Sequence, residues 1–192
     1  MNWKKKREVC FRYNAQADAY DELYSEEQRA KYELVLSHLA LRSEERILDS
    51  GCGTGILLER VAGRVESAVG VDFSPRMLAK AKLKLKKRSN VELVCADFDH
   101  LPFLEGWFTH IFMFDALPDP ASWDPPLREA LRVLGTEGGV ALAVPKKEVS
   151  QEELLENLSI QGLELREFII HRDAPDHLLI GERFPQPSKA CS

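Results

Sequence analysis

A glycine-rich segment is the first feature of the sequence that could do chemistry. Residues 46–61 read RILDSGCGTGILLERV, in which Gly51, Gly53 and Gly55 occupy every second position behind Asp49. Glycine adopts positive φ and lets a ligand approach the backbone, and a helix that begins near Gly55 would direct free N–H groups into the same crevice. A tight turn that only packs a helix on a strand would account for one or two of the glycines. The pattern therefore predicts a binding loop.

The residues around the loop indicate which class of ligand it would bind. A dinucleotide-binding loop reads G-x-G-x-x-G, whereas here the third glycine comes one residue early and Ile56 takes its place. The carboxylate of Asp49 would repel a pyrophosphate and attract an ammonium or sulfonium group. We therefore expect a cofactor with a positively charged group rather than a nicotinamide dinucleotide.

Three more aspartates follow predicted strands. Asp72 ends the second strand, Asp97 follows the third and Asp115 follows the fourth. Asp72 could instead help to cap the helix after Ser74, and Asp97 could serve a turn. Because ligands of open α/β sheets bind at the carboxyl ends of the strands, the shared placement of Asp49, Asp72 and Asp97 favours a common site. Asp115, at the end of the fourth strand, would be a substrate contact or a base.

Other polar side chains are open to structural interpretations. His100 is interpreted as a loop residue and His110 as a strand-entry residue. The lysine-rich run over 80–88 suits the carboxyl end of a solvated helix. Tyr20 has two interpretations: it contacts the ligand as part of a lid, or it packs an N-terminal helix against the sheet.

The elements that must position these residues alternate between strand and helix. Apolar runs predict five strands, with amphipathic helices after and between them. Ser74 before a proline, and Ser150 three residues before Glu153, are helix start signals. Ser25 and Gln28 give the same signal for a helix over 25–41. The predicted strands are RILDS, SAVGVDF, NVELVCADF, HIFMFDAL and GGVALAVP, and the later predicted helices are ILLERVAG, PRMLAKAKLKLKKR, PLREALRVLG (ended by Gly135) and SQEELLENLSIQG.

The last part of the chain departs from this alternation. The runs LELREFIIHRD and HLLIGERF are separated only by APD, and strands joined by so short a loop are antiparallel. We expect an α/β fold: a doubly wound, Rossmann-like sheet of seven strands, mostly parallel, with an antiparallel C-terminal hairpin and an N-terminal helical cap. Residues 1–192 are expected to form one domain, with a cap or lid over 1–43, a core over 44–184 and a frayed tail over 185–192.

Composition narrows the classes of partner and compartment. A net charge of −5 over 192 residues gives no general attraction to phosphate backbones. The cysteines at 10, 52, 95 and 191 form no CxxC pair, which fits neither a disulfide framework nor a zinc site. No apolar run suits a signal peptide or a membrane span. We expect a cytoplasmic protein with no metal and no membrane partner.

The sequence resembles one enzyme family over about residues 45–145. The pattern Asp49-x-Gly51-x-Gly53-x-Gly55 is similar to motif I of the class I S-adenosylmethionine-dependent methyltransferases, of the small, single-domain, type 11 or UbiE-like kind. The likeness continues through VGVDFSPRMLAKA, CADFDHLPF, GWFTHIFMFDAL and LREALRVLGTEGGVALAVP. This resemblance implies S-adenosylmethionine as the cofactor and S-adenosylhomocysteine as its product.

The resemblance also implies roles for individual residues. Asp72 would accept both ribose hydroxyls, and Asp97 would accept the adenine amino group. The methionine portion of the cofactor would run along the glycine loop. The residues expected to bind the cofactor are Asp49, Gly51, Cys52, Gly53, Gly55, Asp72, Phe73, Met77, Asp97, Phe98 and, as a lid contact, Tyr20.

The implied function is methyl transfer by in-line displacement to an unidentified acceptor, with a small molecule favoured. The Asn-Pro-Pro-Tyr signature for methylating planar nitrogens is absent, since the fourth strand ends in FDALPD, and no Pro-Cys nucleophile is present. Two alternatives stay open: an RNA or protein methyltransferase subunit that works with an activating partner protein, and a non-catalytic module that binds S-adenosylmethionine. A nicotinamide oxidoreductase is opposed by Asp49 and Ile56.

Overall fold

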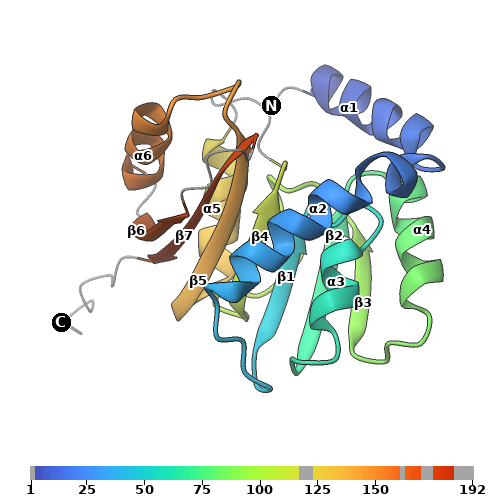
Figure 1. Ribbon diagram of the computed structural model, residues 1–192, viewed down its shortest axis with the longest axis horizontal. Coiled ribbons are helices and arrows are strands. Elements are labelled where there is room, and N and C mark those ends of the chain that lie inside the picture. Colours follow the sequence, from blue (N-terminus) through green and yellow to red (C-terminus); the bar gives the residue numbers. More distant parts are fainter. Residues whose placement is uncertain (1–2, 117–122, 161–162, 170–174, 184–192) are drawn as a thin grey trace.

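A computed structural model describes residues 3–116, 123–160, 163–169 and 175–183. Its centre is a seven-stranded sheet with the order β3-β2-β1-β4-β5-β7-β6 (Figure 1). The strands are β1 Arg46–Ser50, β2 Ser67–Asp72, β3 Val91–Cys95, β4 Phe108–Phe114, β5 Leu134–Pro145, β6 Leu163–Ile169 and β7 Asp176–Arg183. The helices are α1 Trp3–Gln16, α2 Tyr20–Ser37, α3 Ile56–Val61, α4 Pro75–Leu85, α5 Asp124–Val133 and α6 Gln151–Ile160.

The pairing confirms the predicted fold class. Strands β1 to β5 pair in parallel, and β7 pairs antiparallel with both β5 and β6. The order reverses at β1, which lies between β2 and β4, so the loop after β1 stands at the topological switch point. The tail predicted at 185–192 and part of the predicted hairpin loop lie outside the described residues.

Alternate residues of the central strands face two separate cores. On β4, Phe112 belongs to one core and Met113 to the other. The first core packs against α2, α3 and α4, and the second against α5 and α6, so the sheet lies between two helical layers (Figure 1). Both faces of β1, β2, β4 and β5 are therefore largely buried, which explains their nearly continuous apolar sequences.

The helix starts were predicted with mixed success. Ser74 caps α4 by accepting a hydrogen bond from Met77 N at 3.2 Å, as predicted. Ser150 likewise accepts from Glu153 N at 3.2 Å. The predicted start of a helix at Ser25 is wrong, because α2 begins five residues earlier at Tyr20, so Ser25 lies inside the helix. Acidic residues in the first turn of α2 favour this earlier start through the helix dipole.

The join between α5 and β5 also differs from the prediction. Gly135 was expected to end the helix, but α5 ends at Val133 and β5 starts at Leu134. Leu134 pairs with Phe108, and the register shifts before His110 pairs with Gly139. This irregularity lets β5 begin four residues before the predicted start of the strand and lengthens it to 12 residues.

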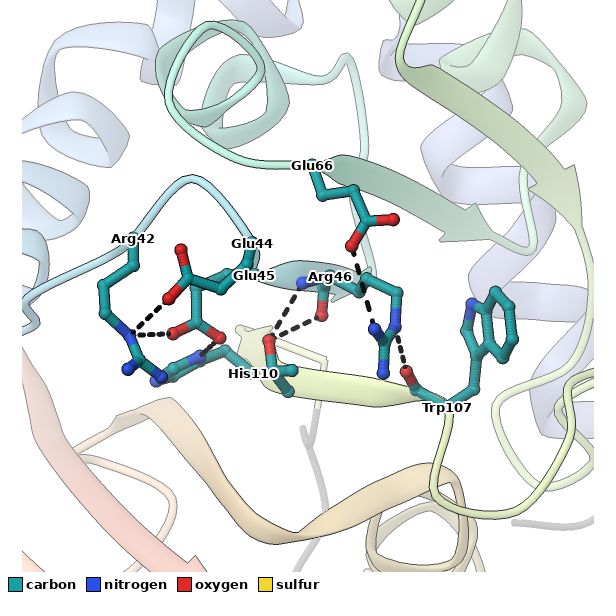
Figure 2. A network of polar contacts seen from close by, with 8 residues as sticks. Arg42, Glu44, Glu45, Arg46, Glu66, Trp107 and His110 are labelled. Carbon is teal, nitrogen blue, oxygen red and sulfur yellow. Dashed lines mark hydrogen bonds and ion pairs between the residues drawn. The ribbon is translucent and has the colours of Figure 1, made fainter.

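Figure 2 shows a polar network at the amino ends of the strands, opposite the carboxyl ends where ligands are expected. Glu45 contacts Arg42 Nε at 3.0 Å and His110 Nδ1 at 3.3 Å. Arg46 donates from Nε to the Trp107 carbonyl at 2.7 Å. Burial lowers the pKa of His110, so its ring is neutral at pH 7. The placement agrees with the interpretation of His110 as a strand-entry residue.

None of the described helices has the length and apolar content that crossing a bilayer requires.

Packing between the sheet and α3 depends on the absence of a side chain at Gly70. A Cβ atom there would lie 2.6 Å from Leu58 Cδ1 and 2.8 Å from Cys52 Sγ. We expect Gly70→Ala to lower the free energy of unfolding by about 1–3 kcal/mol, measured by urea denaturation. The control is Gly63→Ala, whose nearest atom would be Arg88 Nη1 at 3.5 Å, with an effect within about 0.5 kcal/mol. Equal stability of the two variants would contradict this packing argument.

Candidate functional site

A pocket lies across the carboxyl ends of β1 to β4, with α1 and the start of α2 beside it. Its walls combine the loops after four strands with side chains of both N-terminal helices, and α1 extends beyond this edge of the sheet in Figure 1. The pocket brings together nine residues that the sequence predicted as site residues. They are Tyr20, Gly51, Gly53, Asp72, Phe73, Met77, Asp97, Phe98 and Asp115.

The glycine loop has the backbone conformation that its sequence predicts. Gly51, Gly53 and Gly55 have φ values of 96°, 51° and 78°. No described atom lies within 4 Å of a Cβ built at Gly53, whereas a Cβ at Gly55 would lie 2.9 Å from Leu85 Cδ1. Gly53 therefore leaves open space beside the pocket, and Gly55 allows the start of α3 to approach α4.

Asp72 is held at the pocket wall by backbone N–H groups. Its Oδ2 accepts from Gly53 N at 2.9 Å, and its Oδ1 accepts from Ser74 N at 2.7 Å. Burial raises the pKa of Asp72, although these hydrogen bonds partly offset the effect. The glycine loop and the end of β2 are thus tied together by one carboxylate.

Asp49 is a buried carboxyl group that has no counterion within the described ranges. It is 2% exposed, and its Oδ2 has no hydrogen-bond partner among the residues that the structure describes. Burial, together with the charge of Asp72, raises the pKa of Asp49 to about 8. A positively charged group bound nearby would relieve both effects.

Helix α1 is attached to the pocket rim by polar and aromatic contacts. Lys6 Nζ lies 2.6 Å from Asp97 Oδ2 and 2.5 Å from Asp99 Oδ2. Cys10 Sγ lies 3.3 Å from the carbonyl oxygen of Phe73. The rings of Trp3 and Phe73 meet edge to face with centroids 5.9 Å apart. These contacts hold α1 over the side of the pocket formed by β2 and β3.

Asp115 lies at the other end of the pocket, after β4. It has a φ of 55°, which is uncommon for a residue other than glycine, although aspartate tolerates it better than most. Its Oδ2 accepts from Gln28 Nε2 at 2.8 Å and lies 3.0 Å from Lys31 Nζ. Backbone strain of this kind persists where surrounding contacts enforce it, and it often marks a functional position.

Three predicted site residues do not line the pocket. Asp49 is buried behind the loop, Gly55 faces α4, and Cys52 is buried with its Sγ toward Gly70. His100 is likewise absent from the pocket wall. The side chain of Cys52 belongs to the first core. Its backbone N–H donates to the Val71 carbonyl, which extends the pairing of β1 with β2 beyond Ser50.

Sequence reasoning missed most of the wall formed by α1. The lining residues of α1 recur at the spacing of one helical face, but the helix has no buried residue and is mostly polar, so hydrophobic periodicity does not reveal its inner face. The lining residues that were not predicted as site residues are Lys6, Val9, Cys10, Arg12, Tyr13, Ser74, Asp99, Phe114, Ala116 and Pro126. Within the described ranges, no group of three or more His, Cys, Asp or Glu residues is arranged to hold a metal ion.

Comparisons with known proteins agree on one family. A family model described as a methyltransferase domain matches residues 47–138. The demethylmenaquinone methyltransferase of Staphylococcus saprophyticus is 30% identical over 144 residues, which are 71% of this chain and 62% of that protein. The malonyl-[acyl-carrier protein] O-methyltransferase of Legionella pneumophila is 28% identical over 185 residues, 94% of this chain and 64% of that protein. The chain thus spans less than two thirds of each relative's length.

The fold also matches a solved structure. One chain of the complex that contains the Haloferax volcanii Trm112 methyltransferase activator superposes with a TM-score of 0.79 at 19% identity. The match covers 90% of this chain and 97% of the solved one. At this identity the likeness shows the fold alone.

The raised pKa of Asp49 predicts that stability falls as pH rises. The folded carboxyl stays protonated up to about pH 8, whereas its ordinary pKa is 3.8, so the unfolded chain releases this proton first. Between these values Asp49 alone lowers the free energy of unfolding by about 1.4 kcal/mol per pH unit. We expect Asp49→Asn to reduce the decline of the thermal midpoint between pH 5 and pH 8.

Exposed Glu26 provides the control for removing one negative charge. Glu26→Gln should leave the pH dependence of the thermal midpoint unchanged. If Asp49→Asn and Glu26→Gln follow the wild-type curve equally, Asp49 is not the group that titrates.

Proposed function

Because the chain belongs to the class I S-adenosylmethionine-dependent methyltransferases, we propose that it transfers the methyl group of S-adenosylmethionine to a small-molecule acceptor and leaves S-adenosylhomocysteine. The observation that carries the proposal is the row of groups along one pocket. The strand order places the loops after β3, β2, β1 and β4 side by side. They contribute, in that order, Asp97, Asp72, the loop of Gly51 and Gly53, and Asp115.

The row fits the successive parts of the cofactor. Asp97 would receive the adenine amino group, Asp72 the ribose hydroxyls, and the glycine loop the methionine portion. Phe73 and Met77 would border the adenine. The position after β4, next in the row, is left for the acceptor.

The charge of the site supports the same assignment. Asp49 is buried and Asp72 is partly buried at the pocket wall; each has a raised pKa, and the charge of Asp72 contributes to the rise at Asp49. The sulfonium and ammonium groups of the cofactor would supply the missing positive charge at this place. A pyrophosphate would increase the repulsion, which argues against a nicotinamide dinucleotide.

In this proposal the chain holds the cofactor and encloses the reacting groups, and it does not have to activate the methyl group. S-adenosylmethionine supplies a methyl group that is already activated for displacement. The glycine loop and Asp72 would orient the donor, while α1 and Tyr20 would exclude water from the pocket. Alignment of two reactants in this way can be worth about 7–11 kcal/mol of barrier reduction.

Two features favour a small acceptor. The names of the curated relatives describe methylation of a quinone precursor in one case and of a malonyl group on a carrier protein in the other. The overall charge of −5 gives no general attraction to RNA. The solved neighbour that contains a methyltransferase activator keeps a second candidate open, in which a partner protein supplies the surface for an RNA or protein substrate.

Binding of the donor is the first test. In calorimetry we expect S-adenosylmethionine and S-adenosylhomocysteine to bind and NAD not to bind. Asp72→Ala should weaken both by about 1.5–3 kcal/mol, the value of a lost charged hydrogen bond, which corresponds to roughly 10- to 150-fold. Binding of NAD without either sulfur compound would refute the proposed cofactor, and unchanged affinity in Asp72→Ala would remove Asp72 from the site.

Gly53 allows a matched test of close approach to the backbone. A Cβ at Gly53 would enter the open space beside the pocket, so Gly53→Ala should weaken cofactor binding at least tenfold. Gly63→Ala, outside the pocket, should bind as the wild type does. Equal binding by the two variants would show that the cofactor does not lie along this loop.

Transfer of labelled methyl groups to cell extract tests the acceptor. We expect label in the small-molecule fraction. Label only in RNA or protein, and only when a partner is added, would favour the second candidate. No label in any fraction, under conditions where the donor binds, would favour a non-catalytic binding module.

A further inference from the structure

The environment of Asp115 restricts the chemistry of the acceptor. One oxygen of this carboxylate, Oδ2, is held by Gln28 and Lys31 of α2. No described residue donates a hydrogen bond to the other oxygen, Oδ1, and the side chain keeps 25% of its surface exposed at the pocket wall. Among the described residues, Asp115 is therefore held at Oδ2 and has no hydrogen-bond donor at Oδ1.

Lys31 is the buried cation that fixes this arrangement. It is 6% exposed, and its Nζ lies 2.5 Å from Asp176 Oδ2 and 3.0 Å from both Asp115 Oδ2 and Glu27 Oε1. Burial on its own would lower the pKa of Lys31, but the three carboxylates outweigh it and raise the pKa, so the ammonium stays charged. The cluster joins α2, β7 and the loop after β4.

The charges in this cluster do not cancel. Three carboxylates surround one ammonium group, and Gln28 is neutral. Burial raises the pKa of the two phenols nearest this end of the pocket, Tyr13 and Tyr20, so they stay neutral at pH 7. Arg12 also lines the pocket, with its guanidinium 5.3 Å from the centroid of the Tyr13 ring. Asp72 adds a further acidic group toward the donor side. At Oδ1 of Asp115 an anionic acceptor group would be repelled, whereas a cationic group or a neutral donor would be attracted.

Resting on the proposed function, we propose that Asp115 anchors the methyl acceptor through Oδ1, and that Lys31 and Gln28 are positioning residues that hold Asp115 for this contact. The acceptor that fits carries an ammonium or hydroxyl group at the reacting end rather than a carboxylate. A chain with this preference would not methylate a free carboxylate to form an ester. In this respect it would differ from the similar protein that is named as an O-methyltransferase of a malonyl group.

A pair of cofactor analogues probes this end of the pocket without knowledge of the acceptor. Sinefungin carries an amino group in place of the transferable methyl, and S-adenosylhomocysteine carries neither. The positive amino group of sinefungin should bind close to Asp115, so we expect the wild type to bind sinefungin at least tenfold more tightly than S-adenosylhomocysteine. Asp115→Asn should lower this preference about tenfold and leave the affinity for S-adenosylhomocysteine within twofold. Glu27→Gln, which alters the exposed rim of the cluster, should retain most of the preference.

The positioning role of Lys31 has its own readout. Lys31→Met should reduce the sinefungin preference severalfold and leave the affinity for S-adenosylhomocysteine within twofold, because Oδ2 of Asp115 loses one of the two contacts that hold it. Lys31→Arg should restore the wild-type preference. If Lys31→Met fails to fold by circular dichroism, Gln28→Leu, which removes the other contact to Oδ2, replaces it and should reduce the preference severalfold.

The outcomes distinguish this inference from the proposed function. If neither analogue binds the wild type, the proposed function fails. If both bind and Asp115→Asn keeps the full preference, or the wild type has none, the anchoring role of Asp115 is wrong while the proposed function stands. In the labelling experiment, the products should retain label in mild alkali, which releases labelled methanol from methyl esters but not from amines or ethers. Release of most of the label would overturn the proposed acceptor class.

Discussion

The burial of acidic groups at the carboxyl ends of the central strands is the constraint on which the rest of the structure depends. Asp49 is buried without a partner among the described residues, and Asp72 is held next to it by two backbone N–H groups. Such an arrangement is unfavourable for folding alone, and the two cores on either side of the sheet provide the rigidity that maintains it. A site of this kind is prepared for a cationic ligand before that ligand arrives.

The aspartates at the carboxyl ends of the strands differ in whether a cationic side chain of the protein contacts them. At β3 and β4 the chain supplies its own cations, Lys6 for Asp97 and Lys31 for Asp115. At β1 and β2 the described part of the chain supplies no cation to Asp49. Asp49, which has no paired cation among the described residues, lies between Asp97 and Asp115, which have one each. A bound cation would therefore be most favourable at Asp49, where the proposed sulfonium would lie. Lys6 belongs to α1 and Lys31 to α2, so the two N-terminal helices supply the cations that contact aspartates of the site.

The sequence was sufficient for the sheet and for the residues at its strand ends, because both depend on local patterns. Alternation of apolar strands with capped helices predicts the winding, and the winding places Asp72, Asp97 and Asp115 on one rim. The sequence was insufficient where the deciding contact joins distant residues. Lys6 meets Asp97 across 91 positions and Lys31 meets Asp115 across 84, and no local pattern reveals either pair. The start of α2 was misplaced because a capping signal inside a helix looks like one at its beginning.

The contact between Lys6 and Asp97 links closure of α1 to occupancy of the adenine side. If Asp97 accepts the purine amino group as proposed, the same carboxylate oxygens cannot also keep their full contact with Lys6. Binding of the adenine group and attachment of α1 through Lys6 then compete for one carboxylate, while Trp3 and Cys10 still hold α1 at Phe73. Dissolved ions weaken a partly exposed pair of this kind more than they weaken contacts in the core, so moderate ionic strength would speed the exchange of product for fresh donor.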